Sequence, residues 1–355
     1  MKHITIIVGA RPNFMKVAPL LRILKQNKSF KSTLIHTGQH YDKKMSDVFF
    51  DDLNIPTPDY NLNVRSGSHA EQTAKIMILF EEICINIKPD LLIVVGDVNS
   101  TMACSIVAKK LHIEVAHIEA GLRSNDRAMP EEINRLVTDS VSDYFFVTED
   151  SGKTNLLNEG HNEKSIFFVG NLMIDSLHYG LEKIKHKSRF KEEEYGLVTL
   201  HRPSNVDNIN KLKEILESLS QISNKIPLLF SIHPRTQNVI TNNNITLNDN
   251  IKVLDALPYL DFLRLMRDSK VIFTDSGGIQ EESTVLKVPC YTLRNNTERP
   301  ITISQGTNYL IGNKKDNILK SFKENQFNIN PNYKIPYGWD GKASSRIFDI
   351  LDQIL

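Results

Sequence analysis

The sequence predicts an α/β protein built from two doubly wound domains, each a parallel sheet with helices on both faces. Short apolar runs recur along the chain with amphipathic stretches between them, which is the pattern of parallel strands buried on both faces and joined by crossover helices. At 355 residues, the chain exceeds the size at which one hydrophobic core keeps growing. Two domains are therefore expected, and in such sheets ligands bind beyond the carboxyl ends of the strands.

The apolar runs locate the strands, and the stretches between them locate the helices. Val17, Leu20 and Leu24 recur at helical spacing behind Pro12, a residue that suits the first turn of a helix. The stretch 238–250 is rich in Asn and lacks periodicity, so a mobile surface loop is expected there. Further helices are expected at 208–222, 259–268 and 278–287. Strands are expected at 4–8, 33–37, 91–95, 113–118, 144–148 and 166–169 in the first half, and at 197–200, 227–232, 251–254, 271–274 and 289–293 in the second.

A stretch dominated by charge, 181–194, lies where the boundary between the two domains is expected. The N-terminal domain is expected to cover residues 1–170 and the C-terminal domain residues 171–341. Apolar residues recur on one helical face of the tail, 342–355, so this helix is expected to pack back on the first domain.

The composition argues against several classes of function. Lys plus Arg is 43 and Asp plus Glu is 42, which leaves a net charge of +1 and no electrostatic footprint for nucleic acid or an anionic membrane. The N-terminal apolar run is too short for a signal peptide and no stretch is long enough to span a bilayer, so a cytoplasmic protein is expected. Cys84, Cys104 and Cys290 lie far apart in apolar surroundings and are expected to be buried free thiols.

Several cofactor motifs are missing from the sequence. It contains no Gly-x-Gly-x-x-Gly opening a helix after a strand, no Walker-type phosphate loop, no His-Glu-x-x-His and no Cys-x-x-Cys pair. Nothing in it therefore implies NAD, ATP hydrolysis or zinc, and neither a cofactor nor a metal is expected.

The most informative motif, Asp-Ser-Gly-Gly-Ile-Gln-Glu-Glu, follows the apolar run 271–274 and is typical of a strand end, a tight turn and a helix start. Gly277 and Gly278 let the backbone approach an anion, the helix N-terminus offers N–H groups, and Ser276 adds a hydroxyl donor. Glu282, one turn further on, is placed to hold the paired hydroxyls of a ribose. A nucleotide diphosphate is the leading ligand, and a plain turn into a capped helix is the alternative.

Polar residues also follow the other strands, and their chemistry differs between the halves. The first half supplies carboxylates, Asp97 and Glu119, whereas the second supplies ligands suited to phosphate, among them His201 and Arg299. A cleft between the domains would bring the two sets together. Carboxylates that face a bound anion have raised pKa values, which suits general acid–base chemistry near neutral pH.

Glu131 and Glu132 begin a helix behind Pro130 and admit two interpretations. They serve either as acid–base groups or as a first-turn acidic pair that complements the helix dipole. Arg135, one turn on, suits either interpretation.

Few of the 11 histidines are candidates for a site. His201 and His233 each follow a predicted strand at its carboxyl end, and only these two histidines are candidate functional residues. His36, His112 and His117 sit in or beside apolar runs, where hydrogen-bonded structural histidines are expected.

A series of motifs runs nearly end to end through the chain. In order they are Gly-Ala-Arg-Pro (9–12) with Lys16, Thr-Gly-Gln-His (37–40), Gly-Asp (96–97), His-Ile-Glu-Ala-Gly-Leu-Arg (117–123), Pro-Glu-Glu-Ile-Asn-Arg (130–135), His-Arg (201–202), Thr-Asp-Ser-Gly-Gly-Ile-Gln-Glu-Glu (274–282) and Thr-Glu-Arg-Pro (297–300). By these motifs the chain resembles the non-hydrolysing UDP-N-acetylglucosamine 2-epimerases, which have a two-domain fold like that of the GT-B glycosyltransferases.

The resemblance implies inversion at carbon 2 of UDP-N-acetylglucosamine, through anti elimination of UDP to 2-acetamidoglucal and re-addition of UDP. It implies no cofactor, a UDP-sugar substrate, a homodimer built from first-domain helices and a role in supplying sugars for surface polysaccharides. Carried over by motif, the catalytic candidates are Asp97, Glu119, Glu131 and His201. The substrate-binding candidates are Ser276, Gly277 and Gly278 for the diphosphate, Glu282 for the ribose, Phe262 beside the uracil, Arg11, Lys16 and Arg299 for charge, and Arg135 and His233.

The chain departs from the family pattern at its first turn. Many members read Gly-Thr-Arg-Pro-Glu there, whereas this chain has Gly-Ala-Arg-Pro-Asn, so Asn13 replaces a carboxylate. Relatives that act on modified sugars, such as diacetamido uronic acids, carry a similar turn, so a modified UDP-sugar is an alternative substrate. Three other functions compete with this interpretation. The carboxylates of the first half argue against a GT-B glycosyltransferase, and the four intact catalytic candidates argue against a UDP-sugar sensor. Hydrolysing 2-epimerases carry His-Gly-Gly-Glu where this chain has Glu-Ala-Gly-Leu-Arg (119–123), which argues against hydrolysis.

Overall fold

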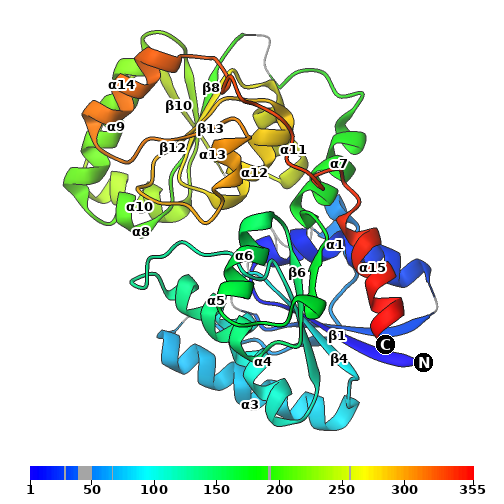
Figure 1. Ribbon diagram of the computed structural model, residues 1–355. Helices are drawn as coiled ribbons and strands as arrows, with labels where there is room; N and C mark the ends of the chain where they lie inside the picture. The colour runs from blue at the N-terminus through cyan, green and yellow to red at the C-terminus, as the bar shows by residue number, and fades with distance from the viewer. Residues whose placement is uncertain (28, 39–49, 66, 191–192, 256) are drawn as a thin grey trace. The chain divides into compact units, whose positions relative to one another are not determined.

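The computed structural model describes residues 1–27, 29–38, 50–65, 67–190, 193–255 and 257–355. The chain divides into two compact units. The first comprises Met1–Tyr179 and Tyr337–Leu355, and the second comprises Gly180–Pro336. Each unit contains one parallel sheet flanked by helices (Figure 1), which confirms the predicted α/β class.

The described part of the first unit has a seven-stranded sheet with the strand order β3-β2-β1-β4-β5-β6-β7. Its strands are β1 (Lys2–Val8), β2 (Phe30–His36), β3 (Tyr60–Asn61), β4 (Leu91–Val95), β5 (Glu114–Ile118), β6 (Tyr144–Val147) and β7 (Ile166–Phe168). Its helices are α1 (Arg11–Gln26), α3 (His69–Ile87), α4 (Asn99–Lys110), α5 (Pro130–Val141), α6 (Asp150–Asn158), the 3-10 turn η1 (Glu163–Ser165) and α15 (Ala343–Ile354). Helix α7 (Leu172–Ile184) begins in the first unit and ends in the second.

The strand order of the first unit contains a reversal that locates its ligand-binding edge. From β1 the chain moves outward to β2, and it later returns to the other side of β1 as β4. Because such crossovers are right-handed, α1 and the helices α3 to α5 cover opposite faces of the sheet. The crevice between β1 and β4 at their carboxyl ends is therefore the topological switch point, where ligands of such sheets bind.

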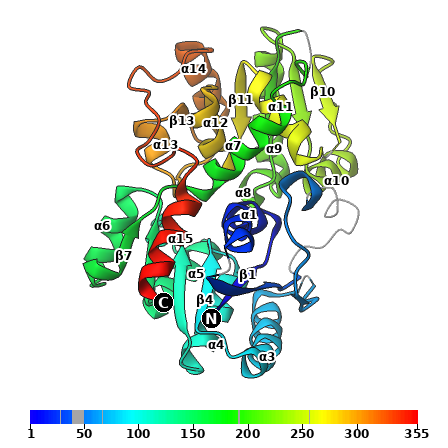
Figure 2. The same ribbon diagram turned by 90° about the vertical axis from the view of Figure 1, so that its right-hand side faces the viewer.

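Helix α15 lies on the same face of the first sheet as α1. Helix α15 packs beside α1 (Figures 1 and 2), and its first turn is held by Asp175, which accepts hydrogen bonds from the N–H groups of Ala343 and Ser344. Trp339, just before this helix, is 1% exposed and donates from its indole to the carbonyl of Thr148.

The described part of the second unit has a six-stranded sheet with the order β10-β9-β8-β11-β12-β13. Its strands are β8 (Gly196–Thr199), β9 (Leu228–Ser231), β10 (Ile251–Leu254), β11 (Val271–Thr274), β12 (Cys290–Thr292) and β13 (Asn308–Leu310). Its helices are α8 (Pro203–Val206), α9 (Ile209–Ser223), α10 (Pro234–Asn242), α11 (Tyr259–Asp268), α12 (Gly277–Leu286), α13 (Ile301–Ser304) and α14 (Lys315–Asn325). The same reversal occurs here, so the switch point lies between β8 and β11.

The surface loop predicted over 238–250 is wrong in its first part, because α10 continues to Asn242. Pro234 occupies the first turn of this helix, and His233 caps it by accepting the N–H of Arg235 on Nδ1. The buried Thr236 anchors the helix through a 2.6 Å hydrogen bond to the carbonyl of Leu200. The polar composition of the segment 238–250 therefore gave no sign that its first residues belong to a capped helix.

Two further predictions can be compared with the structure. Cys84, Cys104 and Cys290 are free and buried, as predicted, and burial raises the pKa of each thiol. Within the described residues, no helix has the length and apolar character needed to cross a membrane.

Candidate active site

The carboxylates of the first unit follow the two central strands β4 and β5. Asp97 lies two residues after β4 and Glu119 directly follows β5. Gly96 (φ +69°) and Glu119 (φ +69°) both adopt the left-handed conformation, which is strained for a residue with a side chain such as Glu119. The backbone of Glu119 is held there by a 3.0 Å hydrogen bond from its N–H to the carbonyl of Phe146. Such held strain is common at functional sites.

Lys16, on α1, joins the Glu119 carboxylate at this edge. Its ammonium lies 2.6 Å from Oε2 of Glu119, and both residues are nearly buried. A Cβ added to Gly96 would lie 3.4 Å from the Lys16 nitrogen and 3.6 Å from Glu119 Oε2, so this ion pair sits against the Gly96-Asp97 turn. The switch point of the first sheet therefore holds a cation and two carboxylates. Arg11 begins α1, and its side chain lies outside what the structure describes.

Asn13 organises the turn that leads into α1. Its side-chain oxygen accepts the N–H groups of Gly9 and Ala10, and its amide donates to the carbonyl of Val95 at the end of β4. A carboxylate at this position could accept the first two bonds but could not donate the third. Asparagine thus ties together the ends of β1 and β4.

Helix α5 separates the roles of two neighbouring glutamates. Glu132 is 2% exposed and accepts the N–H groups of Ser124 and Asn125, so it is a structural residue that shapes the preceding loop. Its carboxylate also pairs with Arg135, whose guanidinium contacts Asp97 Oδ2 at 2.9 and 3.1 Å. Arg135, which lies on α5 with Glu132, therefore orients Asp97.

Glu131 remains the acid–base candidate on α5. It lies in the first turn of the helix and is half-buried, unlike the buried Glu132 beside it. Consecutive helical residues point about 100° apart, so only one of this pair can face the loop at 124–125.

In the second unit, His201 and Asp275 form a hydrogen-bonded pair at the switch point. His201 follows β8 and Asp275 follows β11, and Nδ1 of the histidine lies 2.9 Å from Oδ1 of the aspartate. Asp275 is fully buried and also accepts the N–H groups of His201 and Arg202 and the amide of Asn205. Burial alone would raise the pKa of Asp275, but the hydrogen bond and charge of His201 and the other donors lower it. An ionised Asp275 fixes a proton on Nδ1 of His201 and directs Nε2 outward.

The N-terminus of α12 is built to receive an anion. Ser276 occupies the N-cap position but its hydroxyl does not cap the helix, so that hydroxyl and the first N–H groups stay available to a ligand. Gly277 begins the helix, and a Cβ there would lie 2.8 Å from the carboxylate of Glu298. Gly278 is the second helical residue. Glycine at position 277 therefore lets the Glu298 carboxylate pack against the start of α12, where a side chain would collide with it.

Further along α12, Glu282 is buried and accepts a 3.1 Å hydrogen bond from the hydroxyl of Tyr259 on α11. Burial raises the pKa of Glu282 to about 8, the Tyr259 hydrogen bond opposes this rise, and the neighbouring Glu281 adds to it. Phe262 lies one turn after Tyr259 and is half-buried. Residues three apart share a helix face, so Phe262 lies on the same side of α11 as the Tyr259–Glu282 contact.

Arg299 packs against the same helix. Its Nε lies 2.6 Å from Oε1 of Glu281, and both side chains are more than nine-tenths buried. Thr297 supports the turn, because its hydroxyl donates to Gln280 and accepts the N–H of Arg299. The Thr-Glu-Arg-Pro motif is therefore attached to α12 through Gln280 and Glu281, and its Glu298 packs against Gly277 at the start of the helix.

His233 lies near His201. Their ring centroids are 5.9 Å apart, and His233 also caps α10. The second unit therefore presents two imidazoles at the carboxyl ends of β8 and β9, the adjacent strands that these residues follow.

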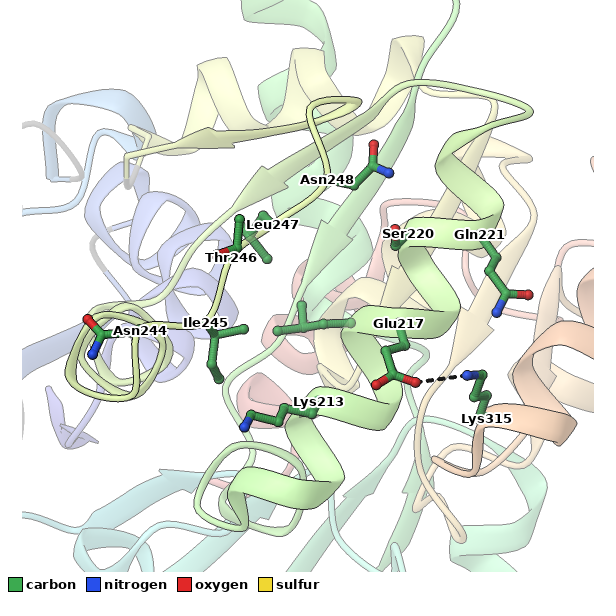
Figure 3. A pocket seen from close by; sticks show the side chains of 11 residues that line it. Lys213, Glu217, Ser220, Gln221, Asn244, Ile245, Thr246, Leu247, Asn248 and Lys315 are labelled. Atoms are coloured by element: carbon green, nitrogen blue, oxygen red, sulfur yellow. Dashed lines mark hydrogen bonds and ion pairs between the residues drawn. The ribbon is translucent and has the colours of Figure 1, made fainter.

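One hollow of the described residues lies apart from the predicted site residues. A hollow on the second unit is lined mainly by polar side chains of α9 and the 244–248 segment, together with Lys315 (Figure 3). It contains none of the residues predicted from sequence, and its Lys315 pairs with Glu217. Among the residues that the structure describes, no three His, Cys, Asp or Glu side chains gather in a group that could hold a metal ion.

Known proteins are similar to this chain over nearly its whole length. A family model described as UDP-N-acetylglucosamine 2-epimerase matches residues 22–352. A UDP-N-acetylglucosamine 2-epimerase of Methanocaldococcus jannaschii is 43% identical over 362 residues, which cover 98% of each chain. The chain belongs to the UDP-N-acetylglucosamine 2-epimerase family.

A solved structure and one further relative are also similar to this chain. A crystal structure of the M. jannaschii UDP-N-acetylglucosamine 2-epimerase, in complex with UDP-N-acetylglucosamine and UDP, matches this epimerase-family chain with a TM-score of 0.92 and covers 99% of both chains at 43% identity. A Pseudomonas aeruginosa enzyme named UDP-2,3-diacetamido-2,3-dideoxy-D-glucuronate 2-epimerase is 38% identical over 358 residues and all of both chains.

Sequence reasoning missed three residues that organise the site of this family member. Asp275 orients His201, Glu281 neutralises Arg299, and Asp139 on α5 binds His117. Asp275 and Glu281 flank the Ser-Gly-Gly turn, so their position within that motif was a usable signal. Asp139 lies outside every motif and gave none.

Proposed function

We propose that the protein interconverts UDP-N-acetylglucosamine and UDP-N-acetylmannosamine. The first unit supplies the acid–base groups and the second binds UDP. The arrangement that carries the proposal is the pair of carboxylates, Asp97 and Glu119, held with Lys16 at one switch point, together with the open N-terminus of α12 at the other.

The reaction requires only groups of these kinds. A base removes the proton from carbon 2 while the bond between carbon 1 and the phosphate oxygen breaks, and UDP leaves with the electron pair to give 2-acetamidoglucal. UDP then adds back to carbon 1 as an acid delivers a proton to the other face of carbon 2. Asp97, Glu119 and Glu131 are the acid–base candidates in this scheme.

The leaving diphosphate needs stabilisation as its negative charge develops. The N–H groups at the start of α12 and the Ser276 hydroxyl provide hydrogen-bond donors for it, and Arg299 and Lys16 provide positive charge. His201, whose Nδ1 is bound to Asp275, adds a donor at Nε2 when its imidazole is protonated. Glu282 is the partner for the ribose hydroxyls and Phe262 the neighbour of the uracil.

The test is proton NMR of the purified protein with UDP-N-acetylglucosamine in deuterated water. UDP-N-acetylmannosamine deuterated at carbon 2 is expected. Free N-acetylmannosamine with UDP would indicate hydrolysis instead, and an unchanged spectrum would contradict the proposed substrate.

A second candidate substrate is a UDP-sugar of the diacetamido uronic acid class. It is favoured by the 38% identical Pseudomonas relative that carries this activity in its name. The same experiment with UDP-2,3-diacetamido-2,3-dideoxyglucuronate separates the two, because turnover of that sugar without turnover of UDP-N-acetylglucosamine would establish the alternative.

We expect Arg299→Ala to reduce both stability and UDP affinity. Removing the guanidinium leaves the Glu281 carboxylate buried without its ion-pair partner, which costs about 3–5 kcal/mol of unfolding free energy. Loss of charge-assisted hydrogen bonds to the diphosphate should weaken UDP binding by about ten- to a hundredfold. The double variant Arg299→Ala/Glu281→Ala separates the effects: stability should partly return while UDP affinity stays low. Recovery of both would contradict a direct role of Arg299 in UDP binding, as measured by calorimetry and thermal unfolding.

We propose further that the protein is a homodimer that associates through α3. This helix is apolar on both sides: Ile76 and Phe80 face the core, while Ile78 and Ile85 are 60% and 55% exposed. Ile78 and Ile85 are seven residues apart and therefore lie on one face of α3, where a second copy of the same helix provides a self-complementary cover for them.

The double substitution Ile78→Glu/Ile85→Glu is expected to convert the dimer to a monomer, as measured by light scattering. Leu157→Glu is the matched control, because Leu157 is an exposed apolar residue on another helix of the same unit, α6. Equal dissociation by both variants, or none by the double variant, would contradict association through α3.

Three buried free thiols fit a reducing compartment, and we propose that the enzyme works in the cytoplasm and supplies precursors of surface polysaccharides.

A further inference from the structure

His117 occupies an unusual hydrogen-bonding environment within β5. It is fully buried, its Nδ1 lies 2.6 Å from Oδ1 of Asp139, and its Nε2 lies 2.9 Å from the backbone carbonyl of Gly96. A carboxylate and a carbonyl oxygen only accept hydrogen bonds. Both ring nitrogens must therefore donate, which requires the imidazolium form of His117.

The charge of Asp139 is balanced from a second side. Its other oxygen, Oδ2, accepts hydrogen bonds from the N–H of Gly121 at 3.0 Å and from Arg123 at 2.7 Å, and Arg123 in turn pairs with Glu159. Burial alone would raise the pKa of Asp139, but the charges and hydrogen bonds of His117 and Arg123 lower it. An ionised Asp139 between two cations completes an alternating row of charges.

This row connects the two turns that carry the proposed acid–base groups. The carbonyl that His117 binds belongs to Gly96, the residue before Asp97, and the N–H of Gly96 donates to the carbonyl of Ile118. Glu119 lies two residues after His117, and Asp139 binds the N–H of Gly121, two residues after Glu119.

Helix α5 anchors both turns through separate residues. It carries Asp139, and it also carries Arg135 and Asn134, which bind the side chain and the backbone carbonyl of Asp97. A shift of the His117 ring would therefore move the Gly96-Asp97 peptide relative to Glu119.

We propose that His117 is a positioning residue for the epimerisation, in which an imidazolium that donates from both ring nitrogens clamps the Gly96-Asp97 turn and the Glu119–Gly121 turn to Asp139 of α5. The inference rests on the proposed function in that Asp97 and Glu119 are the groups whose separation it fixes. His117 itself reaches no substrate in this scheme, since its two nitrogens are both committed to protein acceptors.

The protonation state is tested on the wild-type protein by nitrogen-15 NMR of labelled histidines. Both ring nitrogens of His117 are expected to carry protons at pH 8. His3 is the internal control, because it is buried in the same unit but has different partners. Its ring contacts the carbonyl of Ile87 and the hydroxyl of Thr33, and this hydroxyl can donate a hydrogen bond to an unprotonated ring nitrogen. Burial also lowers the pKa of His3. His3 should therefore show one protonated nitrogen. One unprotonated nitrogen on His117 at this pH would overturn the proposal.

The kinetic test compares His117→Gln with His3→Gln. Glutamine is uncharged and its two N–H donors share one nitrogen, so it cannot reproduce the two contacts that His117 makes from opposite ring positions. His117→Gln should therefore lower kcat by about 10²-fold with little change in KM, as expected for misplaced catalytic groups. His3→Gln should lower thermal stability without changing kcat. A loss of stability alone in His117→Gln would overturn the positioning role.

The two tests keep this proposal distinct from the proposed function. A charged His117 in a protein that turns over no UDP-sugar would refute the function and leave the clamp intact. A neutral His117 in an active epimerase would refute the clamp and leave the proposed function intact.

Discussion

Glu119→Gln is expected to lower the rate of epimerisation by about 10³-fold, within the range that a single general acid or base contributes. Glutamine has the same size and still offers an oxygen to Lys16, whose ammonium lies 2.6 Å from Glu119 Oε2. It cannot gain or lose the proton that inversion at carbon 2 requires. UDP affinity should be largely retained, since the diphosphate ligands of the proposed site other than Lys16 lie in the second unit.

The measurement combines carbon-2 deuteration by NMR with UDP binding by calorimetry. Glu114→Gln is the matched control, because Glu114 begins the same strand, β5, and is exposed. Its rate should equal that of the wild type. Full turnover by Glu119→Gln, or a loss of UDP binding with turnover intact, would contradict the division of labour between the units.

Glu282 is expected to make the protein less stable as the pH rises from about 4.5 to 8. Burial raises its pKa to about 8 from an ordinary value of 4.5, so in this range the folded protein holds a proton that the unfolded chain releases. This contribution to stability is fully present below the unfolded pKa and is lost as the pH rises through the folded pKa. The slope it adds is at most about 1.4 kcal/mol of unfolding free energy per pH unit.

Glu282→Gln should remove this slope, because the amide stays neutral at every pH in the range. Thermal unfolding of both proteins between pH 5 and pH 8 checks the prediction, and Glu214→Gln, an exposed carboxylate of the same unit on α9, is the control. Parallel curves for wild type and Glu282→Gln would show that Glu282 is ionised in the folded protein.

If an ionised Glu282 accepts the ribose hydroxyls, UDP binding near pH 7 should also release a proton, which calorimetry in buffers of different ionisation enthalpy detects.

The strands that form the centre of each sheet could be predicted because their burial on both faces leaves an uninterrupted apolar run. Leu91–Val95 consists of five apolar residues that are all buried. Strands β3 and β13 have two and three residues and include Asn, so they carry no such run and escaped prediction. Their pairing is imposed by the neighbouring strands rather than by their own composition.

The site could be predicted as a set of motifs but not as a network. Sequence reasoning selected Glu119, His201 and Ser276 because each follows a strand, and the structure puts each at a strand's carboxyl end. Only the family resemblance singled out Glu131 from Glu132, because the loop that captures Glu132 is defined by tertiary packing and leaves no local signal in the sequence. His117 is buried and hydrogen-bonded as predicted, yet its partner Asp139 lies 22 residues away and belongs to no motif.

The division of the chain has a consequence for its synthesis. The first unit is discontinuous, since its segment Tyr337–Leu355 follows the entire second unit. A ribosome therefore releases the second unit complete while the first still lacks α15 and the buried Trp339. Domains generally fold as units during translation, from the N-terminus onward. Here the order is inverted, and the N-terminal unit reaches its final packing only after the second unit has been made, when the chain's single tryptophan docks on Thr148.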